Sequence, residues 1–128
     1  MPKYLTQEWL DEYCKLAETQ PVRPGATARI QYVTAGTPEG DVKYYWILED
    51  GKINEIKLGE ISDNDFTITM AYDDAVKVQK GELDPNAAFM QGKMKVTGNM
   101  AKLMSLLPLT NSPEYKALQE EVRGVTDW

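Results

Sequence analysis

The stretch from residue 66 to residue 107 constrains the fold most, because strand and helix patterns alternate there with clear boundaries. Over residues 66–71, apolar and polar side chains alternate, which predicts a half-buried strand. Asp73 is suited to cap a short helix, and Gly81 is suited to end it in a left-handed conformation. The pattern therefore favours a mixed fold of strands and helices.

Two further short helices are predicted within the same stretch, with a strand between them. The first covers residues 84–92, where an acidic N-cap is followed by proline at the first helical position. Residues 93–97 alternate again and predict a strand. The second helix begins after Asn99 and is expected to end at Pro108, with a linker over residues 109–111 that could act as a hinge.

The N-terminal part of the chain is predicted to form a helix, bounded by Thr6 and Pro21, and then three strands. Asp50-Gly51 is a strong hairpin signal, since a type I′ turn requires positive φ at both positions. The expected strands cover residues 26–33, 42–48 and 52–58, with a loop over 36–41 and a last helix over 112–124. We therefore expect an α+β fold with a five-stranded, mostly antiparallel sheet and helices on one face.

Composition limits the kinds of partner. A chain of 128 residues forms one domain, here residues 1–128, and its net charge of −6 disfavours nucleic acid and anionic membrane surfaces as general partners. The first ten residues lack the apolar core of a signal peptide, and no apolar run could span a bilayer, so stable membrane insertion is not expected. The single Cys14 cannot form an internal disulfide, and a cytoplasmic location is the default expectation.

The residues that usually carry catalysis are missing. The chain has no histidine, the commonest general base and zinc ligand, and Cys14 is expected to pack in the core. Gly92-Lys93 is not a phosphate-binding loop, because Met94 stands where that motif requires serine or threonine. Asp73-Asp74 could form an acid pair, but helix capping explains them. We therefore expect no enzyme activity, no cofactor and no metal.

The same central stretch resembles the sterol carrier protein domain family. The resemblance rests on Leu83-Asp84-Pro85, Ala88-Phe89-Met90, Gly92-Lys93-Met94-Lys95, Gly98 and Leu103, and it extends over about residues 25–107. It implies an SCP2-like fold in which a lipid lies between the sheet and the helices, inside an apolar tunnel that the C-terminal region helps to close.

A surplus of apolar side chains gives candidates for contacts in such a tunnel. Five of the six methionines lie in or beside the central stretch, and methionine packs adaptably around flexible alkyl chains. The alternative is that each one simply fills the core. The proposed lipid-binding residues are Trp46, Phe66, Ile68, Met70, Phe89, Met90, Met94, Met100, Leu103, Met104 and Leu107.

Three lysines are candidates for holding an anionic head group at the mouth of the tunnel. Lys93, Lys95 and Lys102 lie in this otherwise apolar region of an acidic protein. The alternative is that each one belongs to a solvated face of a helix or strand.

The sequence therefore leads to one main functional hypothesis, non-enzymatic binding and transfer of a fatty acid, acyl-CoA, sterol or phospholipid. The rival hypothesis is an accessory or assembly subunit that presents a lipid or hydrophobic metabolite to a partner enzyme. A homodimer is also compatible with the sequence.

Overall fold

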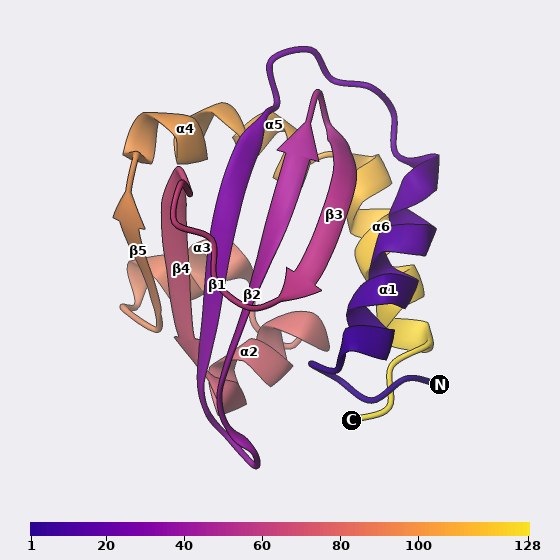
Figure 1. The fold of residues 1–128 in the computed structure, drawn as a ribbon, viewed down its shortest axis with the longest axis vertical. Helices are drawn as coiled ribbons and strands as arrows, with labels where there is room; N and C mark the ends of the chain where they lie inside the picture. The colour runs from indigo at the N-terminus through magenta and orange to yellow at the C-terminus, as the bar shows by residue number, and fades with distance from the viewer.

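The computed structural model describes all residues, Met1–Trp128, as one curved sheet with helices against it (Figure 1). The strands are β1 (Ala28–Thr37), β2 (Gly40–Glu49), β3 (Lys52–Leu58), β4 (Phe66–Ala71) and β5 (Met94–Gly98). Their order is β3-β2-β1-β4-β5, and only the β1–β4 pair is parallel. The predicted five-stranded, mostly antiparallel α+β fold is confirmed.

The two N-terminal turns differ in how well the sequence predicts them. Asp50 and Gly51 have φ of 49° and 83°, as the predicted hairpin between β2 and β3 requires. The predicted loop over residues 36–41 is wrong, because β1 and β2 continue until Thr37 pairs with Gly40. A register shift between Thr34 and Thr37 lets the strands continue, and Gly36 supplies positive φ within it.

The strand register places one row of apolar side chains after another on a single face. Tyr32 of β1 pairs with Tyr44 of β2 and with Ile68 of β4, and Ile68 pairs with Val96 of β5. Side chains of directly paired residues point to the same side of a sheet. This face is therefore apolar across four strands.

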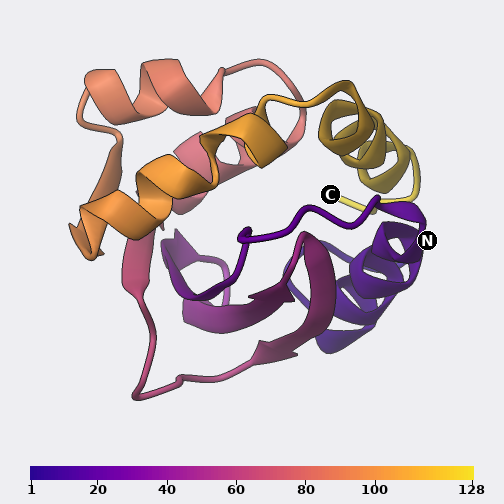
Figure 2. The ribbon, with the colours of Figure 1, turned by 90° about the horizontal axis from the view of Figure 1, so that it is seen from above.

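The other face is crossed by the segment over residues 59–65, which carries the chain from β3 to β4 (Figure 2). Gln31, a buried residue of β1, fixes this crossing. Its Nε2 donates to the carbonyls of Tyr44 (3.0 Å) and Gly59 (3.1 Å), and its Oε1 accepts from the Ile61 amide (2.9 Å). The helices must therefore pack on the opposite face.

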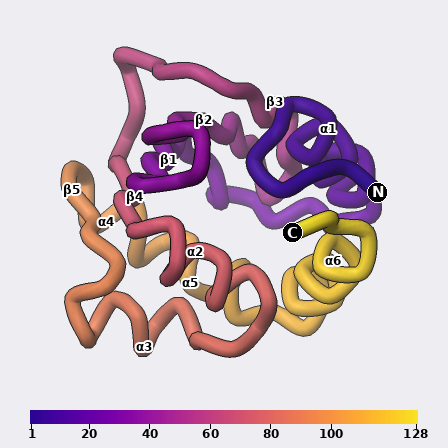
Figure 3. Tube along the Cα trace, turned by 90° about the horizontal axis from the view of Figure 1, so that it is seen from below, coloured from indigo at the N-terminus to yellow at the C-terminus, as the bar shows by residue number.

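The helices cover that opposite face and the β3 edge (Figures 2 and 3). They are α1 (Gln7–Leu16) with the 3-10 turn η1 (Ala17–Thr19), α2 (Tyr72–Gln79), α3 (Pro85–Met90), α4 (Met100–Ser105), α5 (Leu107–Thr110) and α6 (Pro113–Gly124). Helix α1 lies beside α6 and β3, whereas α2 to α5 lie over the sheet. None of these helices is both long and apolar enough to span a bilayer.

Most helix boundaries follow the predicted capping residues. The side chains of Thr6, Asp84 and Asn99 accept hydrogen bonds from the first turns of α1, α3 and α4. The prediction that Asp73 caps α2 is wrong, because β4 runs directly into a helix that begins at Tyr72 without a side-chain cap.

Pro108 does not end helical structure, and the predicted linker after it is wrong. Leu106 closes α4, and α5 follows at once with Pro108 in its first turn, where a backbone N–H is not needed. The hinge hypothesis therefore loses its structural basis, because Leu109 is a buried core residue.

The N-terminal helix anchors the core. The Trp9 side chain is 2% exposed, and its Nε1 donates to Thr126 Oγ1 at 2.8 Å. Backbone bonds from the Tyr4 amide to the Asp127 carbonyl (2.9 Å) and from the Asp127 amide to the Pro2 carbonyl (2.8 Å) tie the two ends of the chain together. Helices α1 and α6 are thereby held as one wall beside the sheet.

Candidate functional site

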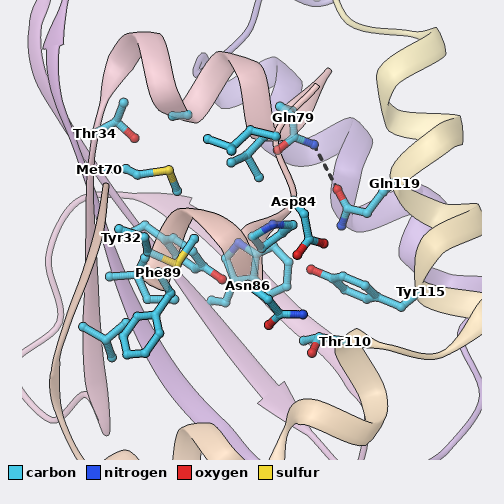
Figure 4. Close-up of a pocket in the computed structure, with 18 of the residues that line it drawn as sticks. Tyr32, Thr34, Met70, Gln79, Asp84, Asn86, Phe89, Thr110, Tyr115 and Gln119 are labelled. Atoms are coloured by element: carbon cyan, nitrogen blue, oxygen red, sulfur yellow. Dashed lines mark hydrogen bonds between the residues drawn. The ribbon is translucent and has the colours of Figure 1, made fainter. Parts of the chain in front are cut away.

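A large cavity lies between the apolar face of the sheet and the helices (Figure 4). Its volume is about 730 Å³, and 20 of its 32 lining residues are hydrophobic. This volume is within the range of small-molecule sites. The interior of the fold is therefore not filled by side chains on this side of the sheet.

The cavity brings together nine of the eleven residues proposed for lipid contacts. They come from β2, β4 and β5 on the sheet and from α3, α4 and α5 among the helices. The nine are Trp46, Ile68, Met70, Phe89, Met94, Met100, Leu103, Met104 and Leu107.

Phe66 and Met90 do not line the cavity. Phe66 is 1% exposed and packs in the core at the start of β4, opposite Gly98 of β5. Helix α3 has six residues, so it can bury only one face: Ala88 is fully buried, whereas Met90 is 86% exposed. Neither position is a candidate for direct contact with a ligand in the cavity.

The three lysines proposed for a head group are also absent from the cavity wall. Lys95 lies between Met94 and Val96 on β5, so strand alternation turns it to the outside, and Lys93 is exposed. Lys102 of α4 is not among the lining residues either. The charged residues of the wall are instead Lys116 and Arg123 of α6, Glu120 of the same helix, and Asp84.

Sequence reasoning missed the contribution of α6, although a signal for it exists. Tyr115, Gln119 and Arg123 are spaced four residues apart, so they form one stripe on the helix, and all three line the cavity. The Gln79 amide donates to Gln119 Oε1 (3.0 Å), and Arg123 Nε donates to the Gln79 carbonyl (2.9 Å). These bonds attach α6 to the end of α2.

One end of the cavity is aromatic. Successive ring centroids lie 4.9, 5.5, 5.2, 5.4 and 4.8 Å apart along a chain that ends in a stacked pair with an interplanar angle of 5°. In order, the rings are those of Tyr4, Trp9, Tyr13, Trp46, Tyr32 and Tyr44, and all six line the cavity. The wall formed by α4 and β5 is aliphatic and rich in methionine instead.

The tyrosine hydroxyls at this aromatic end are held in their protonated form. Burial raises the pKa of Tyr13, Tyr32, Tyr44 and Tyr115 above the ordinary value of 10.0, because a phenolate there would lose its hydration. The Gln119 amide donates to the Tyr13 hydroxyl. These groups therefore offer neutral hydrogen-bonding atoms to whatever occupies the cavity.

Alkaline pH is expected to destabilise the fold through the same tyrosines and Tyr4, whose pKa burial also raises. Above about pH 10 the unfolded chain loses these protons and the folded chain keeps them, so the free energy of unfolding falls as pH rises. Below the unfolded pKa the contribution is fully present. The tyrosinate absorbance of these five of the seven tyrosines should appear together with the loss of circular dichroism. Absorbance from all seven that appears before unfolding would show that solvent reaches the buried hydroxyls freely.

The cavity opens to solvent near α3 and α4. Phe89, Met100 and Met104 line it and are also 44%, 42% and 60% exposed. Figure 2 shows α3 and α4 as separate segments above the sheet. The opening therefore has an apolar rim. No group of three or more His, Cys, Asp or Glu side chains could hold a metal ion.

Comparisons with known proteins agree with this architecture. The model of the SCP-2 sterol transfer family matches residues 11–111. Hydroxysteroid dehydrogenase-like protein 2 of Bos taurus is 42% identical over 73 residues, which cover 56% of this chain and 18% of that protein. Sterol carrier protein 2 of Homo sapiens is 47% identical over 49 residues, covering 38% and 9%. The chain thus spans less than a fifth of these relatives.

Solved structures show the same fold. A crystal structure of sterol carrier protein 2 has a TM-score of 0.73 at 20% identity and covers 94% of this chain and 98% of that one. The palmitated Sterol Carrier Protein 2 Like 2 of Aedes aegypti has a TM-score of 0.63 at 19% identity, covering 82% and 94%. At these identities the likeness concerns the fold.

Proposed function

Because the chain belongs to the SCP-2 sterol transfer family, we propose that its cavity holds the hydrocarbon part of a single lipid and that the protein transfers lipids without altering them. The observation that carries the proposal is the apolar cavity of about 730 Å³ between sheet and helices. The proposed contacts are the nine sequence-predicted residues that line it, together with the aromatic wall.

Hydrophobic burial supplies enough free energy for this role. Each CH₂ group transferred from water contributes about 0.8 kcal/mol, so a ten-carbon segment contributes roughly 8 kcal/mol before the cost of association. Such contacts discriminate little between chains. We therefore propose that the cavity accepts fatty acids, acyl-CoA, sterols and phospholipids, and that the shape of the ligand decides which of them bind.

Electrostatics at the cavity wall support a carrier rather than an enzyme. Lys116 and Arg123 are balanced by Asp84 and Glu120, so the wall has no net charge that would select one sign of head group strongly. The buried tyrosines keep their protons and are poor nucleophiles. An anionic head group would reach Lys116 at the exposed side of α6 more readily than Lys93, Lys95 or Lys102.

The rival function, an accessory subunit for a partner enzyme, is favoured by one observation. The matched region forms 18% of a longer protein named hydroxysteroid dehydrogenase-like protein 2, so related domains occur joined to other sequences. In that case the exposed Phe89 and Met104 would contact a protein partner.

Binding of the fluorescent fatty acid cis-parinaric acid tests the proposed function. The purified protein is expected to bind one molecule, with quenching of Trp46 emission because this buried indole lines the cavity. Organic extraction and native mass spectrometry should find a lipid in the protein as isolated. Absence of parinaric acid binding, together with a stable hetero-complex, would establish the rival function.

A further inference from the structure

Two tyrosine side chains lie side by side at the aromatic end of the cavity. Tyr32 and Tyr44 are directly paired on β1 and β2, so both leave the same face of the sheet, and their rings are stacked with centroids 4.8 Å apart. Figure 4 shows the Tyr32 hydroxyl directed into the cavity and Tyr115 directed toward it from α6. The pair therefore forms a defined polar spot on an aromatic surface.

Neither hydroxyl of the pair has a hydrogen-bond partner in the protein. Every fully enclosed side-chain nitrogen or oxygen in the structure does have one. The Tyr32 and Tyr44 hydroxyls must therefore remain open to the cavity, where a bound molecule can reach them. Each offers one donated hydrogen and can also accept one.

The surroundings of the pair disfavour an ionised group. Burial and neighbouring tyrosines raise the pKa of Tyr32 and Tyr44, and no basic side chain lowers it. Arg123 is held at the end of α2 by the bond from its Nε to the Gln79 carbonyl (2.9 Å), and Lys116 is exposed at the surface of α6. A carboxylate at the pair would lose its hydration without gaining a cation, which costs far more than burying a neutral oxygen that is hydrogen-bonded.

We propose that Tyr32 and Tyr44 form a subsite for a neutral oxygen of the ligand, so that the preferred ligands are long-chain lipids with an alcohol, ketone or ester group that enters the cavity first. An alcohol oxygen can accept from one tyrosine and donate to the other. Its alkyl chain then lies along the methionine-rich wall toward the opening between α3 and α4. This inference rests on the proposed function.

Displacement of cis-parinaric acid by 1-hexadecanol and by palmitic acid tests the subsite. The double variant Tyr32→Phe/Tyr44→Phe is expected to bind 1-hexadecanol about tenfold more weakly, because the alcohol is left buried without partners. Its affinity for palmitic acid should change less than about twofold. Tyr45→Phe is the matched control, since Tyr45 lies next to Tyr44 on β2 but does not line the cavity.

The outcomes distinguish a failure of the proposed subsite from a failure of the proposed lipid binding in the cavity. Equal weakening of both competitors, or of neither, would overturn the subsite and leave the proposed function standing. A wild-type protein that binds no parinaric acid would overturn both.

A second, independent observation concerns the charge around the opening. Residues 85–113 contain Lys93, Lys95 and Lys102 but no acidic residue. The rest of the chain holds all 20 acidic residues and the other 11 of the 14 basic residues. The same segment carries four of the seven large apolar side chains that are most exposed, namely Phe89, Met90, Met100 and Met104. A basic, apolar surface thus borders the opening of an acidic protein.

The geometry points to docking of this surface on an anionic lipid bilayer. Near a bilayer, each lysine is attracted to anionic head groups and apolar side chains enter the interface. Three of the four exposed apolar residues also line the cavity, so the cavity of a docked protein would open toward the membrane. The expectation from net charge alone, that anionic membranes repel the chain, would then hold only for its other surfaces.

Sedimentation with vesicles tests the docking surface. Binding is expected to equimolar phosphatidylcholine and phosphatidylglycerol, and to be several-fold weaker to phosphatidylcholine alone. Met90→Glu should lower vesicle binding about tenfold without changing parinaric acid affinity, since Met90 does not line the cavity. Leu58→Glu is the control, an exposed apolar residue on β3, at the opposite edge of the sheet from β5. Equal binding to both vesicle types, or equal effects of the two variants, would overturn the proposal.

Discussion

The Leu103→Glu variant is expected to bind cis-parinaric acid at least about a hundredfold more weakly than the wild-type protein. Leu103 of α4 lines the cavity and is only partly accessible. A carboxylate there must either lose its hydration when a chain enters or occupy the place of the chain, and both costs are large. Fluorescence titration measures the affinity, and a thermal melt checks that the variant is folded.

Ala101→Glu is the matched control, because Ala101 is exposed on the same helix and does not line the cavity. It should bind parinaric acid like the wild-type protein. Met104 of the same helix also lines the cavity but is 60% exposed, so a carboxylate there can turn to water and its effect should be smaller. Unchanged affinity in Leu103→Glu would mean that the lipid binds elsewhere.

The Gly98→Ala variant is expected to lose about 3 kcal/mol of unfolding free energy or more. Gly98 ends β5 with φ of +116°, a conformation that disfavours any side chain. An added Cβ would lie 2.7 Å from the Asp65 carbonyl oxygen and 2.8 Å from Phe66 Cα, and both are backbone atoms that cannot rotate away. Urea denaturation measures the loss.

Gly92→Ala separates the two causes of this loss. Gly92 also has positive φ, +75°, but an added Cβ there would meet no atom within 4 Å. Its cost should therefore be the conformational one alone, about 1 kcal/mol. Equal destabilisation of the two variants would show that close packing against β4 contributes nothing.

Local signals in the sequence predict most elements of the fold. The caps at Thr6, Asp84 and Asn99 and the turn at Asp50-Gly51 depend on neighbours within a few residues, so the chain itself specifies them. The errors at residues 36–41 and at Pro108 arise because glycine permits a register shift and proline permits a helical first turn. Glycine disfavours a regular strand and proline disfavours a helix interior, but neither residue requires a loop in its place.

The site is predictable only in part, because it combines distant segments. Alternation along β4 and β5 finds Ile68, Met70 and Met94 on the cavity wall, and the same alternation should have turned Lys95 outward. The wall formed by Trp9 of α1 and Tyr115 of α6 depends on how those helices dock against the sheet. No short sequence pattern contains that information.

The crossing over residues 59–65 has a consequence for the order of assembly. Strands β1, β2 and β3 are joined by tight turns and can nucleate as consecutive hairpins, whereas the parallel β1–β4 pairing closes a much longer loop and is entropically slower. The helices over the sheet, α2 to α5, follow β4 in the chain, so they are expected to dock late. These helices form the layer that docks last, and a lipid must pass through the same layer to reach the cavity. Lipid exchange can therefore proceed by partial opening of the helices while the hairpins of β1, β2 and β3 stay intact.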